Sequence, residues 1–517
     1  MSTRLEVSRR GLRFTFTNVP VPSAVDILVS GHRVWSVSID APGPDGWVRL
    51  SWPNALRPYL RGTATIAVRE SATGEVLASR NVSLGLSRRP MEIRDGQGKL
   101  LSVNKWLRLS SSLEADADGV RERLLQSATT VTAQLQELGY AAYICSGTLL
   151  GAIRRGDLLP HDDDVDLGIL LEHSNPSDLT LDSYRLEDEL VALGHTVVRH
   201  SSVHVQVMFL REGGRTDHYV DIFSAFYRNE HEFCQPFHIR TDVPRSSIVP
   251  TRQLELSGAL LPAPAKPEDW LAACYGPNWE TPDPSFRFRT PTSTRRRFDN
   301  WFGSQNMNRD FWESTYAGDE GASASPGDAK HLRTLSRLLP PGAPVADLGS
   351  GTGFQAEVIA SHGHQVIGVD YSFRAVALAR QGGGHAQFRV LNLYDRRRLL
   401  EFGAELVRSG HPWHFNLSHI LEGLTEAGRE NVFLFLHLVM KPGSFAFATV
   451  DVNFSAVHYR PELPQTWHLP LAALRAEAAR HGLEVEVISR GRRRTSAGPR
   501  RTVTVVVRQP PSIPASL

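Results

Sequence analysis

The sequence has few cysteines and no long apolar run, and these absences exclude several classes of protein. It holds three cysteines (Cys145, Cys234 and Cys274) without a CxxC pair, so neither a zinc ribbon nor a disulfide framework is expected. The longest apolar runs, such as residues 432–440, fall far short of the ~20 residues that span a bilayer. Residues 1–10 lack the apolar centre of a signal peptide. We therefore expect a cytoplasmic protein, with peripheral association at the inner face of the membrane left open.

An excess of charge of either sign is also absent. The chain has 57 Lys and Arg residues against 55 Asp and Glu residues, for a formal net charge of +2. No strong global field therefore favours nucleic acid or an acidic membrane surface. Three Arg-rich clusters, at residues 295–297, 396–398 and 490–494, come without an RNA-binding signature and are interpreted as solvated faces. We expect no nucleic-acid partner and no transmembrane segment.

The length and the pattern along the chain predict several domains. At ~150 residues per domain, 517 residues correspond to three or four. Residues 1–95 carry short runs rich in Val, Ile and Thr between turn signals, which predicts an all-β sandwich as an accessory domain. Residues 96–300 mix helical and strand patterns in an α+β arrangement, with a helix expected over 120–138 and a stop at Gly139.

The last third of the chain has a different pattern. Residues 301–335 are polar and irregular, which predicts a linker and a cofactor-covering arm. Residues 336–510 alternate strands and helices, which is typical of an α/β doubly wound parallel sheet. Two final strands, 483–488 and 502–507, are expected to form an antiparallel hairpin joined by an Arg-rich connection.

A glycine-rich turn follows the first strand of this C-terminal domain, in the sequence VADLGSGTGF. Gly349, Gly351 and Gly353 let the backbone pass close under a ligand. Asp370 lies at the end of the next expected strand, where a carboxylate accepts hydrogen bonds from ribose hydroxyls. A dinucleotide-binding loop, G-x-G-x-x-G, would need glycine where Phe354 stands, so the pattern favours a different nucleoside ligand.

The loop resembles that of class I S-adenosylmethionine (SAM) methyltransferases, a family with a Rossmann-like fold. The resemblance implies that the loop, with Asp347 before it, cradles the methionine part of SAM. It further implies that Asp370 binds the ribose and that Asn392 stands near the adenine. An aromatic helix over the cofactor is implied by three residues upstream: Phe311, Trp312 and Tyr316.

Methyl transfer from a sulfonium is an in-line displacement, so the protein mainly has to position the nucleophile and exclude water. A general base is optional. The candidates after the fourth strand are His419 and Glu422, and each is also suited to a capping or packing role.

An acidic run lies in the middle of the chain, where residues 161–167 read HDDDVDL. Asp164 and Asp166 flank one apolar residue in an expected strand, and alternation puts both carboxylates on one face. Asp221 is the one acid in the apolar run 218–223 and offers a third. Like charges held together need a cation or a proton between them, and hard oxygens suit Mg²⁺. A solvated acidic turn and a structural Ca²⁺ site stay open as alternatives.

The acidic run and its neighbours resemble the LicD/fukutin-type branch of the nucleotidyltransferase-fold superfamily. The resemblance rests on the run GTLLGAIR at residues 147–154, the acidic run, Asp221 and the segment 275–282. It implies a polymerase-beta-like core in which Asp164, Asp166 and Asp221 bind Mg²⁺ or Mn²⁺. It also implies that donor phosphate is bound by three residues of the first run: Gly147, Thr148 and Arg154.

The two resemblances together imply a bifunctional transferase. One domain would transfer a phospho-group, phosphocholine-like or alditol-phosphate-like, from a CDP-activated donor to a glycan. The other would transfer methyl from SAM within the same surface-glycan or glycoconjugate modification. Two alternatives stay open: a methyltransferase whose LicD-like domain only binds glycan or phosphate, and a non-catalytic scaffold of a glycan-synthesis complex.

Overall fold

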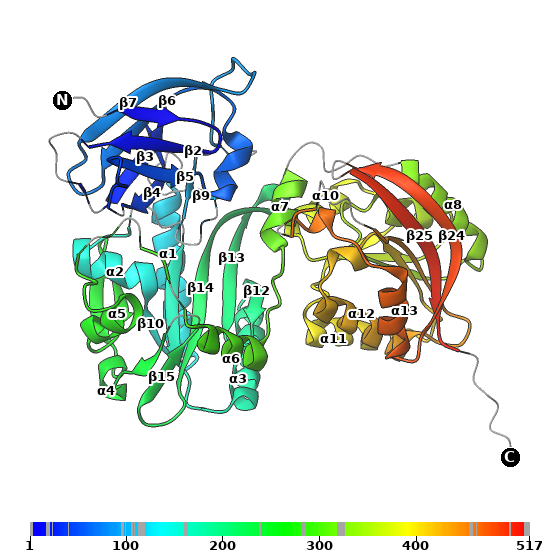
Figure 1. The fold of residues 1–517 in the computed structure, drawn as a ribbon. Helices are drawn as coiled ribbons and strands as arrows, with labels where there is room; N and C mark the ends of the chain where they lie inside the picture. The colour runs from blue at the N-terminus through cyan, green and yellow to red at the C-terminus, as the bar shows by residue number, and fades with distance from the viewer. Residues whose placement is uncertain are drawn as a thin grey trace. The chain divides into compact units, whose positions relative to one another are not determined.

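The computed structural model describes residues 4–16, 21–22, 24–39, 41–94, 98, 100–104, 107, 109–111, 119–159, 164–236, 239–281, 283, 286–288, 290–317, 326–453, 459–461, 463–495 and 498–510. The chain forms two compact units (Figure 1). The first consists of Met1–Phe209 and Asp217–Gly303, and the second of Leu210–Thr216 and Ser304–Leu517. Among the described residues, no helix is both long and apolar enough to cross a bilayer.

The first 84 residues build two antiparallel sheets. One sheet has the strand order β1 (Leu5–Val7), β2 (Gly11–Thr15) and β5 (Trp47–Ser51). The other has the order β4 (His32–Ser38), β3 (Ala24–Val29), β6 (Gly62–Glu70) and β7 (Val76–Leu84). Both sheets contribute to one hydrophobic core that includes Phe14, Val25 and Trp52. Every run expected in this stretch forms a strand, and the β-sandwich assignment stays a prediction.

A second sheet region follows the short pair β8 (Leu101–Val103) and β9 (Leu109–Ser111). Its strands are ordered β10 (Ala141–Ile144), β11 (Val165–Leu170), β14 (Arg215–Tyr227), β13 (His204–Arg211) and β12 (Thr196–Ser201), and β15 (Glu232–Gln235) and β16 (Ile239–Asp242) extend it from β14. β11 and β14 run parallel, whereas β10 is antiparallel to β11. The strands β17 (Arg252–Leu256) and β18 (Ala259–Ala263) form a separate hairpin.

Helices pack on this sheet through one continuous core. They are α1 (Val120–Glu137), α2 (Ser146–Arg155), α3 (Pro176–Ala192), α4 (Arg245–Ile248), α5 (Pro267–Tyr275) and α6 (Thr292–Phe302). α1 was expected from the spacing of its apolar residues, and its buried positions include Leu124, Val131 and Leu135. Gly139, at φ 89°, reverses the chain after α1 in a conformation that other residues adopt at a cost.

The second unit contains a seven-stranded sheet. Its order is β21 (Gln387–Val390), β20 (Val366–Asp370), β19 (Val345–Leu348), β22 (His414–Ser418), β23 (Ala446–Asp451), β25 (Gly498–Arg508) and β24 (Glu484–Thr495). The first five strands are parallel, and β25 is antiparallel to β23. This order confirms the doubly wound sheet and its terminal antiparallel hairpin.

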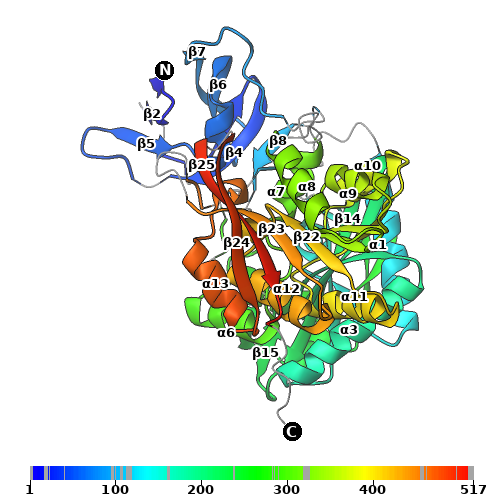
Figure 2. The same cartoon turned by 90° about the vertical axis from the view of Figure 1, so that its right-hand side faces the viewer.

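Helices cover both faces of this sheet (Figure 1 and Figure 2). One face packs against α8 (Pro326–Leu338), α9 (Phe354–Ser361) and α10 (Phe373–Gln381). The opposite face packs against α11 (Arg396–Arg408), α12 (Glu426–Val439) and α13 (Leu471–Ala479). The sheet is therefore buried on both sides, as its near-continuous apolar strands require.

One expectation about the last third was wrong in detail. The Arg-rich segment 490–494 was expected to connect two strands, yet it lies inside β24 and pairs with β25. The stretch 301–335, expected to be a linker and a cofactor-covering arm, contains α7 (Arg309–Ala317), where the resemblance implied an aromatic helix, and most of α8. Because both segments place polar residues on exposed faces, their composition resembles that of loops.

Candidate functional sites

The three aspartates selected from the sequence lie together in the first unit. Asp166 on β11 is the register partner of Asp221 on the parallel strand β14, and Asp164 comes just before β11. Each residue offers a carboxylate oxygen, and these oxygens all lie within 4.8 Å of one another. Asp166 and Asp221 are buried. Three carboxylates at this spacing repel one another strongly unless positive charge lies among them.

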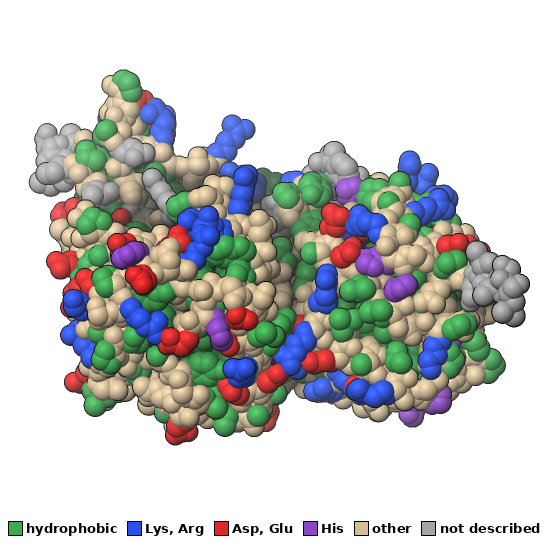
Figure 3. Space-filling view, turned by 90° about the horizontal axis from the view of Figure 1, so that it is seen from below, with side chains coloured by type: hydrophobic (Ala, Val, Ile, Leu, Met, Phe, Trp, Pro, Cys, Tyr) green, Lys and Arg blue, Asp and Glu red, His purple; other side chains and the backbone are tan. Residues whose placement is uncertain are grey.

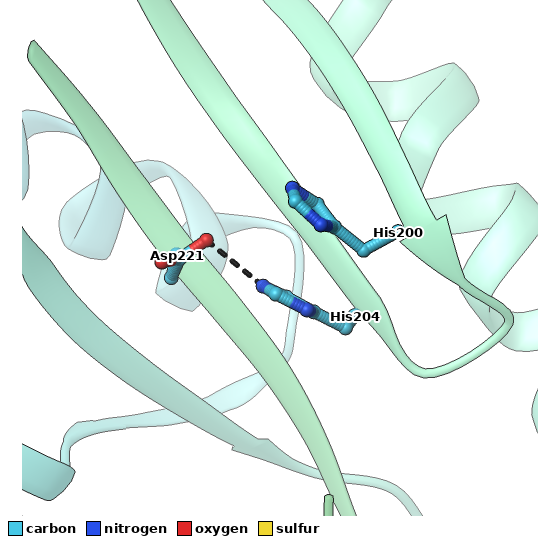
Figure 4. Close-up of side chains that lie close together, drawn as sticks. All are labelled: His200, His204 and Asp221. Carbon is cyan, nitrogen blue, oxygen red and sulfur yellow. Dashed lines mark hydrogen bonds and ion pairs between the residues drawn. The ribbon is translucent and has the colours of Figure 1, made fainter. Parts of the chain in front are cut away.

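Neighbouring side chains fix the carboxylate of Asp221. His204 Nε2 lies 2.8 Å from Asp221 Oδ1, and Gln206 Nε2 donates to the same oxygen at 3.0 Å. Figure 4 shows His204 reaching toward Asp221, with the His200 ring beside it. Burial lowers the pKa of His204 to about 3, so its imidazole is neutral at physiological pH.

Sequence reasoning did not select His204 or Gln206. Both lie on β13, the neighbour of β14 in the sheet, and both side chains reach Asp221. The available signal was the alternation of polar and apolar residues in the run HVQV at 204–207, which places His204 and Gln206 on one face of the strand.

The residues expected to bind donor phosphate belong to α2, which follows β10. Gly147 lies in the first turn of α2, where backbone N–H groups lack intrahelical partners. The Thr148 side chain is wholly buried, and its Oγ1 accepts a hydrogen bond at 2.9 Å from the Asp166 N–H. Thr148 therefore anchors the strand that carries Asp166, and its contact with a donor phosphate stays a prediction.

Arg154 also contacts the protein backbone, and its contact with donor phosphate stays a prediction. Its Nη2 donates to the carbonyl oxygens of Trp279 and Thr281, the latter at 3.0 Å. The guanidinium thus fastens the segment after α5 to the end of α2, and its pKa is lowered by burial. This arrangement supports a structural role, because the side chain is already held by backbone oxygens. Asp162 and Asp163 of the acidic run lie outside the described residues.

The glycine loop of the second unit follows β19 and passes close to other groups. Gly349, Gly351 and Gly353 all have positive φ, at 76°, 53° and 84°. A Cβ on Gly351 would lie 2.9 Å from Tyr316 Oη, and one on Gly353 would lie 2.5 Å from the Phe388 ring. Only glycine satisfies both the backbone conformation and the available space here.

Two buried carboxyls flank this loop. Asp347 accepts a hydrogen bond at 2.8 Å from Asn416 Nδ2, while its Oδ2 is buried and has no hydrogen-bond partner among the described residues. Burial raises the pKa of Asp347 to about 7. Asp370 accepts from the backbone N–H groups of Gly351 and Ser372 at 3.0 and 2.9 Å, yet burial still raises its pKa to about 6.

The helix α7 lies against the same end of the sheet, as the expected aromatic helix would. Tyr316 contacts the loop at Gly351 and stacks on Trp312. Glu313 accepts hydrogen bonds from Ser372 Oγ and from the Phe373 N–H, each at 2.8 Å. Because a carboxylate at a helix N-terminus also interacts with the helix dipole, Glu313 holds α7 to the start of α10.

The expected adenine contact is engaged with the backbone. Asn392 Nδ2 donates to the Gln305 carbonyl at 2.5 Å, and its Oδ1 accepts from the Tyr394 N–H at 3.0 Å. The residue therefore joins the loop after β21 to the segment before α7. A contact from Asn392 to an adenine ring stays a prediction.

The candidate base lies after β22 in a strained conformation. His419 has φ 58°, which is uncommon for a residue other than glycine. Its Nδ1 lies 2.8 Å from Glu422 Oε1, its side chain is 22% exposed, and Asp451 Oδ1 is 3.9 Å from Nδ1. The Glu422 bond fixes one ring nitrogen and leaves Nε2 available, which is the arrangement of an oriented base.

Two of the Arg-rich clusters contain arginines that pair with acids. Arg398 forms an ion pair with Glu401, and Arg493 binds Asp451 through two hydrogen bonds at 2.9 and 2.8 Å. On the face seen in Figure 3, basic and acidic side chains are interspersed. Neither observation points to a nucleic-acid surface.

Two family models match the chain. Residues 139–266 match the LicD/FKTN/FKRP nucleotidyltransferase domain, and residues 346–402 match a methyltransferase domain. Among curated proteins, the mouse (Mus musculus) protein named ribitol-5-phosphate transferase FKTN is 26% identical over 170 residues, which are 32% of this chain and 35% of that protein. The chain thus matches about a third of that relative's length.

Solved structures similar to the chain include SAM-dependent methyltransferases. One from Methanosarcina mazei is 17% identical, with a TM-score of 0.27, and covers 34% of this chain and 97% of its own. Magnesium protoporphyrin IX methyltransferase from Synechocystis PCC 6803 is 16% identical, with a TM-score of 0.28, and covers 39% of this chain and 96% of its own.

The two family matches confirm the two resemblances drawn from sequence motifs. The chain carries a LicD/fukutin-type nucleotidyltransferase domain followed by a methyltransferase domain.

Proposed function

We propose that the LicD-type domain transfers a phospho-group from a CDP-activated donor to a glycan, with Mg²⁺ or Mn²⁺ held by Asp164, Asp166 and Asp221. The main support for this proposal is that Asp166 and Asp221 are register partners on adjacent parallel strands and that Asp164 lies beside them. Three carboxylate oxygens within 4.8 Å fit a hard divalent cation. Cations bound there would activate the acceptor hydroxyl and stabilise charge on the transferring phosphate.

The protein's own groups have separate parts in this proposal. Asp166 and Asp221 present their carboxylates from rigid strands, so little reorganisation precedes the reaction. Thr148 keeps Asp166 in place through the backbone bond described above. The N-terminus of α2, at Gly147, offers N–H groups to a phosphate, which agrees with the preference of helix N-termini for anions.

Release of CMP from CDP-linked donors tests this proposal. The donors should include CDP-choline and CDP-ribitol, since the matched relative is named for ribitol 5-phosphate transfer. We expect Mg²⁺-dependent CMP release that falls by about 100-fold or more in Asp166→Asn, because even the loss of an outer-shell partner of a metal ligand costs about 10–100-fold. Asp242→Asn, an exposed acid of the same domain, is the matched control. Equal CMP release by Asp166→Asn and Asp242→Asn would refute the proposal.

We further propose that the second domain transfers methyl from SAM to a hydroxyl on the glycan or on the group attached to it. The buried, unpartnered Asp347 Oδ2 beside the glycine loop fits a cationic amino group such as that of SAM's methionine part. Asp370, at the end of β20, would accept hydrogen bonds from the ribose hydroxyls. His419, oriented by Glu422, would take the hydroxyl proton as methyl is transferred.

Methyl transfer from radiolabelled SAM to glycan fragments tests this second activity. Acceptors with and without prior phospho-transfer should be compared, and greater methylation of the treated acceptor is expected if the two domains act in sequence. Retained methyl transfer with no effect of Asp164→Asn on any product would instead favour the binding-module alternative. Gly351→Arg should abolish SAM binding, because a side chain at Gly351 meets Tyr316. SAM binding to the wild type that is lost in this variant would argue against a non-catalytic scaffold.

A further inference from the structure

A second group of metal-ligand side chains lies beside the three aspartates. His200 near the end of β12, His204 at the start of β13 and Asp221 on β14 each offer one ligand atom, and these atoms lie within 4.8 Å of one another. The turn of Ser202 and Val203 joins β12 to β13, so the two histidines come from one tight hairpin. Figure 4 shows the two rings next to the carboxylate.

The spacing of these atoms suits a shared cation. His204 Nε2 and Asp221 Oδ1 are 2.8 Å apart. Two ligands bound tetrahedrally to one cation at ~2.1 Å lie ~3.4 Å apart, so these two atoms would separate by about 0.6 Å. A cation between them would replace their hydrogen bond, with the imidazole proton of His204 on Nδ1. The His200 ring would also turn out of its stack on His204, because the lone pair that binds a metal lies in the ring plane.

Several contacts hold the His204 ring and the Asp221 carboxylate in place. His204 stacks on His200 with centroids 4.3 Å apart and on Phe223 with centroids 4.3 Å apart. Gln206 donates to Asp221 Oδ1 at 3.0 Å, and its Oε1 lies 3.4 Å from His200 Nε2. Such outer contacts orient imidazole and carboxylate ligands in known metal sites and raise their affinity for the metal.

The ligand set differs in kind from the all-oxygen group beside it. Two imidazoles and one carboxylate favour Zn²⁺ and neighbouring transition-metal ions, whereas carboxylates alone favour Mg²⁺. Asp221 belongs to both groups, and a carboxylate with two oxygens can bridge two cations ~3.5–4 Å apart.

We propose that His200, His204 and Asp221 form a second cation site, selective for a transition-metal ion such as Zn²⁺, that shares Asp221 with the Mg²⁺ site. The site deepens the proposed phospho-transfer function through this shared carboxylate. Its metal binding, however, does not depend on any transfer reaction.

Direct metal binding to the full chain tests the inference. Zn²⁺ and Mg²⁺ are titrated separately by calorimetry, and Co²⁺ serves as a spectroscopic probe of nitrogen ligation. We expect His204→Ala and His200→Ala each to weaken Zn²⁺ binding by about 100-fold or more, beyond the loss seen when only an outer contact is removed. Mg²⁺ binding should stay within about twofold of wild type in His200→Ala, because its proposed ligands are retained. In His204→Ala it should fall less than Zn²⁺ binding does, because His204 only orients the Mg²⁺ ligand Asp221.

Further variants separate this inference from the proposed function. Asp164→Asn should weaken Mg²⁺ binding and leave Zn²⁺ binding unchanged, since Asp164 is not a ligand of the second site. His231→Ala, an exposed histidine of the same domain, should leave both unchanged. The inference is overturned if Zn²⁺ binds equally well to wild type and both histidine variants, or if bound Co²⁺ shows no nitrogen ligation. If the wild-type chain binds Zn²⁺ as expected but does not bind Mg²⁺, the result contradicts the proposed function and leaves this inference standing.

Discussion

Replacing Asp347 with asparagine should stabilise the protein while weakening SAM binding. Burial raises the pKa of this carboxyl from 3.8 to about 7. The folded chain therefore holds the proton at a pH at which the unfolded chain has released it, so ionisation of Asp347 opposes folding. The opposition is absent below pH ~4, grows as the pH rises toward 7 and is constant above that.

The size of the expected stabilisation follows from the change in the pKa of Asp347. Each tenfold change in an equilibrium corresponds to about 1.4 kcal/mol, so a change from 3.8 to about 7 corresponds to about 4 kcal/mol. Even half of this, about 2 kcal/mol, would raise the melting temperature of a unit of this size by about 4–8 °C. The asparagine side chain in Asp347→Asn keeps an oxygen to accept the hydrogen bond from Asn416, so the exchange removes charge and retains shape.

Thermal unfolding of the full chain between pH 5.5 and 8.5 measures the stability, and calorimetry measures SAM binding. We expect the gain of Asp347→Asn to increase with pH up to about 7.5, and SAM affinity to fall by about tenfold or more. Asp310→Asn, an exposed acid of α7, should change neither quantity. A variant that is destabilised equally at every pH, or that binds SAM as wild type does, would refute the reasoning.

Three other contacts lead to measurable outcomes. Glu313→Ala removes the bonds to the start of α10, so thermal unfolding should show a loss of about 1 kcal/mol, with weaker SAM binding than in Glu313→Gln. Arg199→Met removes the cation whose Nε lies 2.6 Å from the buried carboxylate of Glu187 and should cost about 3–5 kcal/mol in urea unfolding, most of it recovered by also changing Glu187→Leu. Gly353→Ala should lower SAM affinity, measured by calorimetry, because its Cβ would meet Phe388, and an unchanged affinity would contradict this account of the loop.

The sequence predicted the parallel sheet well because its strands are short apolar runs between turn signals. The alternation of strands and helices expected over residues 336–510 is found from β19 to β25. Buried strands require apolar residues on both faces, and this requirement is visible without any knowledge of tertiary contacts.

The Arg-rich part of β24 could not be recognised in the same way. The strand lies at the end of the sheet, and exposed residues such as Arg490 and Arg492 alternate along it with partly buried ones. An edge strand with charged side chains has the composition of a loop, and only its pairing with β25 identifies it.

The positions of the carboxylates followed from alternation, but the contacts of their neighbours did not. Asp164, Asp166 and Asp221 were selected because carboxylates in apolar strands are costly to bury unless a cation or a proton lies among them. Thr148 and Arg154 were assigned to phosphate by resemblance, whereas the fold directs one to a strand backbone and the other to a later segment. Such long-range contacts depend on the packing of α2 and α5, which local sequence does not specify.

Because Asp166 and Asp221 are register partners on adjacent strands, the distance between their carboxylates does not depend on how many residues connect the two strands. Since the parallel register alone sets their spacing, insertions or deletions in the intervening helix and hairpin would leave the two carboxylates side by side. A slip of one residue within either strand would instead turn one acid to the opposite face of the sheet. Homologues should therefore vary in the length of the segment between β11 and β14, but should show no single-residue insertion or deletion inside either strand.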